Sequence, residues 1–493
     1  MSKVREKLLT DTFDVKGIWF LPESDMSKEG IKGTLRYSPS RITLELIGTF
    51  NQVSPFTNAE TPHELTIYGF SEVGEWFTLL DCLPTQARMS APGFDTVTYI
   101  VNQFYAGTKI VQSEDAVENA IFSFTNLDAW LDYNIIERCE EWNTKKTTFT
   151  IDLALPSCDR KKLDIPSKSL VLNEEIGYSL KFPKEYFLNE KTEIIVSRFY
   201  RFSSATVALL SPTHLLESMQ QFRRLLSLLI GSAMYFSYIE LNFPSVKETI
   251  PNGKELEIKQ HCKLFFNQVG DMFKVKRLTR IRQNSMLIKR HDLGEKMSSV
   301  FNYWFDEQEK LSEITSPYIS DLYFPSYIES KYLNVVRGLE TYHRFFIENK
   351  AEEQVSSSHN DELNRECEQI LSFINENISE SNREYFSKRV CYEGEQNFRQ
   401  RLKTLLGLTP AKLSVHLFGE MNSKDRNKLI STIIDTRNYF THRDDKTRYI
   451  NAVSDHIQLD NLTEQLSSLL QFFCLTQLGI DPDTVVQRIK DFS

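Results

Sequence analysis

The spacing of apolar residues changes part-way along this chain, and this change constrains the fold more strongly than any single motif. Residues 15–210 contain short alternating or apolar runs, such as 17–22 (GIWFLP) and 42–48 (ITLELIG), separated by Gly, Pro and Ser. Such runs are typical of strands in a sandwich or a barrel. From about residue 277 onward the apolar residues recur at helical spacing. The pattern predicts an α+β multidomain protein, with a β-rich, sandwich- or barrel-like amino-terminal region and an all-α carboxy-terminal domain.

The same pattern predicts where the segments begin and end. We expect a β-rich region over residues 1–275, a helical linker over 276–320 and a helical domain over 321–493. A polar, Ser-rich stretch at 351–361 predicts an exposed loop between helices. Individual helices are predicted over residues 212–235, 362–378, 394–406, 411–420, 424–441 and 458–479.

Composition excludes several classes of protein. A net charge of −9 over 493 residues argues against a general DNA-coating protein. The seven cysteines are scattered and form no C-x-x-C pair, so we expect no zinc site, no disulfide framework, no metal and no cofactor. The amino terminus lacks the apolar core of a signal peptide. The longest apolar-rich stretch, 225–238, is too short to cross a bilayer and is predicted as a buried core helix, so no membrane contact is expected. The scattered cysteines favour a reducing cytoplasm.

Arg437, Asn438 and His442 form the pattern Arg-Asn-x-x-x-His near the end of the predicted 424–441 helix. At this composition the tight pattern has a chance expectation on the order of 0.03. The looser form, an arginine followed by a histidine four to six positions on, is expected roughly once and also occurs at Arg337 and His343. Only the tight pattern is therefore informative. Its plainer interpretation is that a helix-terminal His and Arg cap carbonyls and stabilise the helix dipole.

These residue types suit metal-independent cleavage of RNA. The ribose 2′-OH is a built-in nucleophile, and a histidine can remove its proton or protonate the leaving 5′-oxygen. An arginine presents a charged fork to the non-bridging phosphate oxygens. On an α-helix Asn438 and His442 share a face, whereas Arg437 lies about 100° round from Asn438. Unless the helix end is distorted, a second subunit is needed to complete the pocket, so the pattern favours a homodimer or a higher homo-oligomer.

Nearly the whole chain resembles the ApeA-like HEPN family of bacterial anti-phage proteins. HEPN domains are helical ribonuclease modules marked by Arg-(Asn/Asp/His)-x-x-x-His. The likeness is carried, in the expected order, by residues 17–22, 33–35, 44–48, 77–82, 126–131, 301–305, 333–343 and 437–442. The resemblance implies an all-α HEPN helical bundle over 321–493, a sensor or regulator over 1–275, and catalytic roles for Arg437, Asn438 and His442. Many such motifs continue with a small residue or Tyr, whereas Arg443 follows here.

Further residues are weaker candidates. The resemblance places Glu340 near the motif, where it would orient His442 or Arg437, while Arg337 and His343 are expected on an exposed polar face. A basic stretch without acidic residues suggests contact with an RNA backbone through Lys274, Lys276, Arg277, Arg280 and Arg282. Its plainer interpretation is a solvated linker. Trp19, Trp76 and Trp130 are expected to pack in cores rather than to stack on bases, and Glu137, Glu140 and Glu141 are expected on a solvated face.

The leading hypothesis is thus a metal-independent endoribonuclease that acts in anti-phage defence by abortive infection, after a phage-derived trigger reaches the amino-terminal region. RNA, such as tRNA, is the expected substrate. The alternative is a non-catalytic HEPN module that dimerises and binds RNA phosphate or protein without cleavage. A third hypothesis is a neutralised toxin that needs a partner or a modification.

Overall fold

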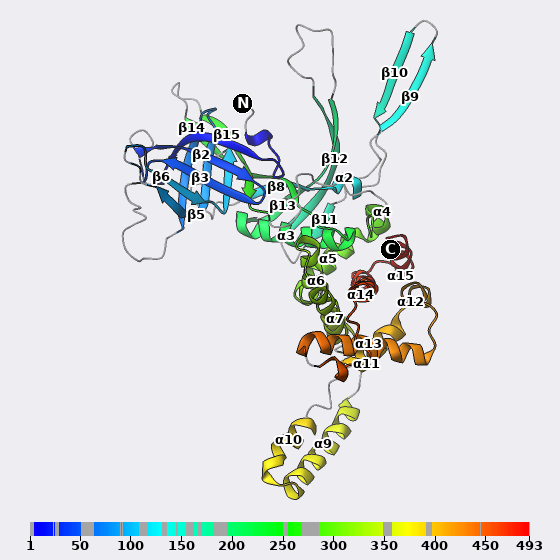
Figure 1. The fold of residues 1–493 in the computed structure, drawn as a ribbon. Coiled ribbons are helices and arrows are strands. Elements are labelled where there is room, and N and C mark those ends of the chain that lie inside the picture. The colour runs from blue at the N-terminus through cyan, green and yellow to red at the C-terminus, as the bar shows by residue number, and fades with distance from the viewer. Residues whose placement is uncertain are drawn as a thin grey trace. The chain divides into compact units, whose positions relative to one another are not determined.

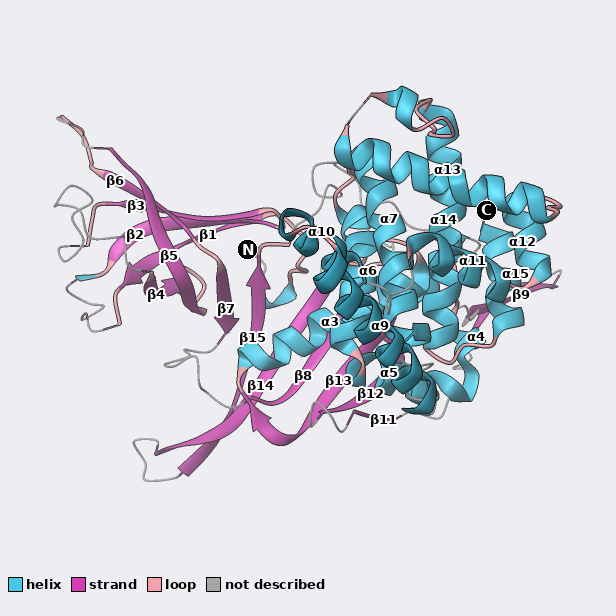
Figure 2. Cartoon of the chain, turned by 90° about the horizontal axis from the view of Figure 1, so that it is seen from below, coloured by secondary structure: helices cyan, strands magenta, loops and turns pink. Residues whose placement is uncertain are grey.

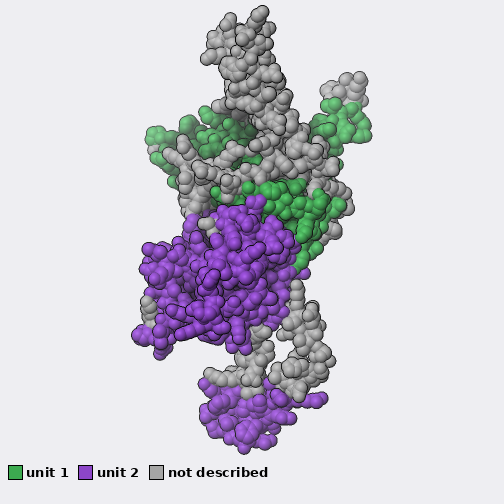
Figure 3. All heavy atoms as spheres, turned by 90° about the vertical axis from the view of Figure 1, so that its right-hand side faces the viewer, with its two compact units in different colours: residues 1–306 green, residues 307–493 purple. Residues whose placement is uncertain are grey.

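The computed structural model describes residues 4–22, 24, 29–50, 64–88, 90, 92–107, 117–130, 136–143, 146–153, 162–165, 170–181, 195–249, 255–268, 285–348, 357–390, 397–443 and 445–492. The chain divides into two compact units, Met1–Asp306 and Glu307–Ser493, which Figure 3 colours separately. The division lies within the segment 276–320, which the sequence predicts as a linker. Each unit is described by itself.

The amino-terminal unit contains a closed β-barrel (Figure 1). Among the described residues, six antiparallel strands follow one another in the order β5-β4-β1-β2-β3-β6, and a further pairing of β6 with β5 closes the ring. Their bounds are β1 (Phe13–Phe20), β2 (Ile31–Ser38), β3 (Arg41–Ile47), β4 (Leu65–Ser71), β5 (Trp76–Arg88) and β6 (Thr96–Ile100). Burial alternates along β3, as expected for a strand with one face on the core.

Strand β5 closes the barrel because it changes partner along its length. Its first half pairs with β7 (Gln103–Gly107) and its second half pairs with β6. Asp81 lies between the two halves with a positive φ of 53°, and a register shift follows between Pro84 and Gln86. Bulges and left-handed residues bend a strand in this way, which allows one strand to turn a barrel corner.

Aromatic side chains fill the barrel. Trp19 is fully buried and its ring lies against that of Phe77. Gly69 makes room for this indole, because a Cβ at that position would lie 2.2 Å from Trp19 Cε3. Trp130, in α2 (Leu127–Trp130), is also fully buried and donates its indole N–H to the Ile288 carbonyl at 2.8 Å. The prediction of core packing is therefore confirmed for these two tryptophans; Trp76 is half-buried.

The sheet continues beyond the barrel in the order β7-β15-β14-β8-β13-β12-β11, with helix α3 lying across it (Figure 2). The Phe222 ring of α3 contacts Phe122 and Phe124 of β8 and Phe202 of β13. The bounds are β8 (Val117–Phe124), β11 (Lys162–Ile165), β12 (Leu170–Lys181), β13 (Ile195–Leu210), α3 (Pro212–Ile230), β14 (Phe236–Thr249) and β15 (Glu255–Phe266). Elsewhere in this unit lie η1 (Val4–Glu6), the hairpin β9 (Ile136–Asn143) and β10 (Lys146–Leu153), α4 (Arg290–Leu293), η5 (Gly294–Lys296) and α5 (Met297–Asp306).

Helix α3 is shorter than the sequence predicts. Ser211 caps its start by accepting from the His214 backbone N–H. The helix ends at Ile230 because Gly231 adopts a left-handed conformation, with φ 75° and its N–H bonded to the Ser227 carbonyl. The apolar stretch 225–238 is therefore a buried helix end followed by the start of β14, and not one core helix. Among the described residues no helix is both long and apolar enough to cross a membrane.

The carboxy-terminal unit is helical, and α7 is its central helix. A buried stripe of Tyr332, Val335, Val336 and Leu339 runs along α7. At Gly338 the helix comes so close to its neighbours that a Cβ would lie 2.8 Å from Leu470 Cδ2 and 3.2 Å from the Ile314 carbonyl oxygen. The helices are α6 (Gln308–Tyr323), α7 (Ile328–His343), the π-helical turn η6 (Arg344–Glu348), α9 (Ser357–Asn377), α10 (Glu380–Val390), α11 (Phe398–Leu408), α12 (Ala411–Phe418), α13 (Ser423–His442), η7 (Lys446–Arg448), α14 (His456–Gln477) and α15 (Pro482–Phe492).

The predicted class, a β-rich region with a barrel followed by an all-α domain, is confirmed. Two helical details differ from the expectation. Helix α9 begins at Ser357, inside the stretch predicted as a loop, and α10 and α15 were not predicted as helices. Helix α10 is largely exposed and polar, so its sequence lacks the apolar period on which helix prediction depends.

Candidate active site

Helix α13 carries the Arg-Asn-x-x-x-His motif in its last two turns. The helix is capped by Asn422, through bonds from the Lys424 and Asp425 backbone N–H groups to the Asn422 side chain. It ends after His442, because Arg443 adopts a left-handed conformation and donates its N–H to the Tyr439 carbonyl at 2.8 Å. The motif thus lies at the carboxyl end of the helix, where the sequence places it.

Buried and polar contacts fix the part of α13 that carries the motif. The Tyr332 hydroxyl of α7 donates to the Ile433 carbonyl at 2.7 Å. Thr436 is fully buried, and its hydroxyl oxygen accepts from the Val453 N–H at 2.9 Å. The Asp435 carboxylate accepts from both the backbone and the side-chain nitrogen of Asn451. These bonds attach the helix to α7 and to the chain segment that follows it, on the turns that lead into the motif.

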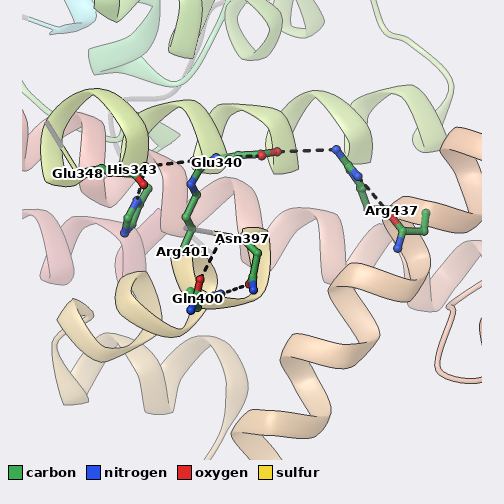
Figure 4. A network of polar contacts seen from close by, with 8 residues as sticks. Glu340, His343, Glu348, Asn397, Gln400, Arg401 and Arg437 are labelled. Atoms are coloured by element: carbon green, nitrogen blue, oxygen red, sulfur yellow. Dashed lines mark hydrogen bonds and ion pairs between the residues drawn. The ribbon is translucent and has the colours of Figure 1, made fainter. Parts of the chain in front are cut away.

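The Arg437 guanidinium is oriented by three neighbours, of which Figure 4 labels Glu340. Its Nη1 donates to the Asn438 Oδ1 at 3.2 Å, and its Nη2 lies 3.8 Å from Glu340 Oε2. The ring of Phe398, at the start of α11, lies 5.8 Å from the guanidinium carbon. The side chain keeps 37% of its surface exposed. Arg437 is therefore held in place and remains accessible to a phosphate.

His442 is exposed at the end of α13. It follows Arg437 by five residues, which places the two side chains about 140° apart around the helix. Asn438 lies about 40° from His442 on the same helix. The chain therefore presents the imidazole and the guanidinium on different sides of α13, while each stays open to solvent.

A buried polar network lies behind Arg437 (Figure 4). Arg401 of α11 is 3% exposed; its Nη1 lies 3.2 Å from Glu340 Oε1 and its Nη2 lies 3.1 Å from Glu348 Oε2. His343 Nδ1 lies 3.9 Å from the same Glu348 oxygen. A continuous series of charged groups thus runs from Glu348 through Arg401 and Glu340 to Arg437.

The prediction of an exposed polar face is confirmed for Arg337 but wrong for His343, which is fully buried. The sequence shows the polar residues of α7 but not the elements that cover them. In the structure Glu348 lies 3.9 Å from His343 Nδ1, and Arg401 of α11 contacts the same carboxylate. Arg401 and Glu348 themselves were not predicted as site residues. The sequence does contain a sign that Arg401 is buried and paired. It lies among the apolar residues Leu402 and Leu405, where a charged side chain needs an oppositely charged or hydrogen-bonding partner.

The burial of His343 makes stability depend on pH. Burial, with a smaller contribution from Arg401, lowers the pKa of His343 below its ordinary 6.5, although Glu348 opposes this. The unfolded chain therefore binds the proton more tightly, so stability falls as the pH drops below about 6.5, by up to about 1.4 kcal/mol per pH unit. We expect urea unfolding between pH 7.5 and 5.5 to show a steeper loss of stability in the wild type than in His343→Gln. Equal slopes would contradict this.

Other predicted residues lie outside the described part of the chain. Lys274, Lys276, Arg277, Arg280 and Arg282 all fall there, so contact with RNA through them stays a prediction. The side chains of Glu137, Glu140 and Glu141 on β9 also lie outside it. Among the described residues no group of three or more His, Cys, Asp or Glu side chains is arranged to hold a metal ion.

Comparison with known proteins assigns the two parts of the chain to one family. Residues 14–304 match the family model described as ApeA N-terminal domain 1, and residues 333–484 match the model described as Apea-like HEPN. No curated protein and no solved structure gave a match. The first match contains the barrel and the sheet that continues it, and the second contains α13 with its motif. The chain therefore belongs to the ApeA-like HEPN family.

Proposed function

We propose that this HEPN-type defence protein is a metal-independent endoribonuclease that acts against phage by abortive infection. The observation that carries the proposal is the complete Arg-Asn-x-x-x-His motif on α13, with His442 exposed and Arg437 oriented but accessible. HEPN domains are commonly nucleases, which supports the same assignment. Arg437, Asn438 and His442 are the proposed catalytic residues.

The proposed reaction uses the nucleophile of the RNA itself. The 2′-oxygen attacks the adjacent phosphorus while the bond to the 5′-oxygen breaks. His442 either takes the 2′-OH proton, with water protonating the leaving 5′-oxygen, or protonates the 5′-oxygen, with water accepting the 2′-OH proton. Arg437 stabilises the charge that develops on the non-bridging oxygens. Asn438 accepts a hydrogen bond from Arg437 and so orients the fork. The products carry a 2′,3′-cyclic phosphate and a 5′-hydroxyl.

The active unit is proposed to be a homodimer. Arg437 and His442 lie about 140° apart around α13, so the two groups reach one phosphate most simply when each comes from a different protomer. RNA, such as tRNA, is the proposed substrate, and a phage-derived signal acting on the amino-terminal region is the proposed trigger. In this scheme the β-rich unit senses and the helical unit cleaves.

Removing divalent metals tests this proposal. We expect purified wild-type protein, once active, to cleave RNA as fast in excess EDTA as in Mg²⁺, because neither proposed group needs a metal ion. Labelling of the product ends, with and without prior phosphatase treatment, should reveal new 5′-hydroxyl ends. Binding of RNA without new ends would instead favour a non-catalytic HEPN module, and loss of cleavage in EDTA would exclude the proposed chemistry.

A further inference from the structure

We propose that Arg401 is a positioning residue for Arg437 and acts through Glu340; this inference rests on the proposed function. Arg401 lies outside the motif, 36 positions before Arg437 in the chain. Its helix, α11, starts with a reciprocal cap, in which Asn397 and Gln400 each accept from the backbone N–H of the other. The cap fixes the helical turn from which Arg401 projects, as Figure 4 shows.

Arg401 brings two carboxylates together. A guanidinium that is 3% exposed has lost nearly all its water, so its charge must be compensated by protein groups. Glu340 Oε1 at 3.2 Å and Glu348 Oε2 at 3.1 Å provide this compensation. Glu340 comes from α7 and Glu348 from the turn η6 that follows it, whereas Arg401 comes from α11, which is distant in sequence, and their mutual contact fixes each of them.

The π-helical turn η6 allows both carboxylates to reach the same guanidinium. On an unbroken α-helix, eight residues turn through about 800°, which would leave Glu340 and Glu348 about 80° apart. The wider i→i+5 turn takes up an extra residue and brings Glu348 back to the side of Glu340. Such turns are found frequently at functional sites, and this one serves to complete the binding of Arg401.

Glu340 is shared between Arg401 and Arg437. One carboxylate oxygen is engaged by Arg401, and the other lies 3.8 Å from Arg437 Nη2. Without Arg401, both oxygens and the full negative charge would be available to Arg437, and a close, bidentate ion pair would form. Such a pair would withdraw the guanidinium from the RNA phosphate. Arg401 therefore lets Glu340 orient Arg437 through one oxygen, and it prevents Glu340 from competing with the RNA phosphate for the Arg437 guanidinium.

Substitution of Arg401 tests this role. We expect Arg401→Gln to lower kcat/KM for RNA cleavage by about 10- to 100-fold. Adding Glu340→Gln to this variant removes the competing charge and should raise the rate at least about threefold above that of Arg401→Gln alone. A merely structural role for Arg401 predicts that the double variant is no faster. Lys403→Gln, an exposed change two positions further along α11, is the control and should leave the rate unchanged.

Thermal unfolding of each variant identifies any that fails to fold. If Arg401→Gln does not fold, Arg401→Lys takes its place; it keeps a buried charge but lacks the fork that engages both carboxylates, so a smaller rise on adding Glu340→Gln is expected. Wild-type rates for Arg401→Gln, or no rise in the double variant, would overturn the positioning role. Undiminished cleavage by His442→Ala would instead overturn the proposed function, so the two failures are distinct.

Discussion

Replacement of His442 by alanine is expected to lower RNA cleavage by about 10²- to 10⁴-fold, the usual contribution of a positioned proton-transfer group. The imidazole is the proposed group that moves a proton at the 2′-oxygen or the 5′-oxygen, and alanine leaves water alone to do so. The exposed side chain lies at the end of α13, so its removal should leave folding nearly unchanged. The measurement is the single-turnover rate at saturating RNA in EDTA, together with the thermal unfolding midpoint.

A second histidine provides a matched control for this variant. His416 is exposed in the last turn of α12, in the same unit, and has no proposed role in cleavage. We expect His416→Ala to cleave at the wild-type rate. If His442→Ala and His416→Ala cleave equally well, the imidazole does not take part in the reaction and the endoribonuclease assignment is wrong.

Replacement of Arg437 by alanine is expected to lower cleavage by about 10²- to 10³-fold, or about 2.7–4 kcal/mol of transition-state stabilisation. The guanidinium acts where charge develops on the phosphate, so most of the loss should appear in the rate at saturating RNA, with a smaller loss of affinity. Arg437→Lys should recover only part of this loss, because an ammonium lacks the planar fork. The half-exposed pair of Arg437 with Glu340, at 3.8 Å, contributes about 0–1 kcal/mol to stability, so the variant should fold.

The control for this variant lies on the same helix. Arg426 is in the first turns of α13, eleven positions before Arg437 and about 16 Å along the axis. Arg426→Ala should therefore leave the single-turnover rate unchanged. If Arg426→Ala and Arg437→Ala lose the same amount of activity, the reaction depends on the overall positive charge of α13 and not on Arg437 itself. That result would favour a role for α13 in binding RNA.

The spacing of apolar residues along the sequence was sufficient to predict a β-rich region followed by a helical one. The alternating runs of the first 210 residues and the helical spacing after 277 follow directly from which faces are buried. The closure of the barrel could not be predicted in this way. It depends on pairing between residues distant in sequence, such as Leu83 with Ile100, and on a left-handed Asp81 that allows β5 to bend.

In the candidate site, too, contacts between residues distant in sequence could not be predicted. The motif is visible in the sequence because its three residues are close together, and helical geometry places Arg437 and His442 on different sides of α13. Burial of His343 and the contacts of Arg401 depend on α11 packing beside α7, and no local pattern records that packing. The π-helical turn that brings Glu348 to Arg401 inserts a residue into the helix, so a strict 3.6-residue period misplaces it.

Mixing two inactive variants tests most directly whether an imidazole and a guanidinium from two protomers act on one phosphate. His442→Ala and Arg437→Ala proteins, unfolded and refolded together to exchange subunits, would form mixed dimers in which one of the two pockets is intact. About half of the dimers would be mixed, so recovery of roughly a quarter of the wild-type cleavage rate is predicted, against refolded wild type as the reference. Two different affinity tags show whether mixed dimers have formed. If the mixed dimers are present but as inactive as the separate variants, the account is contradicted.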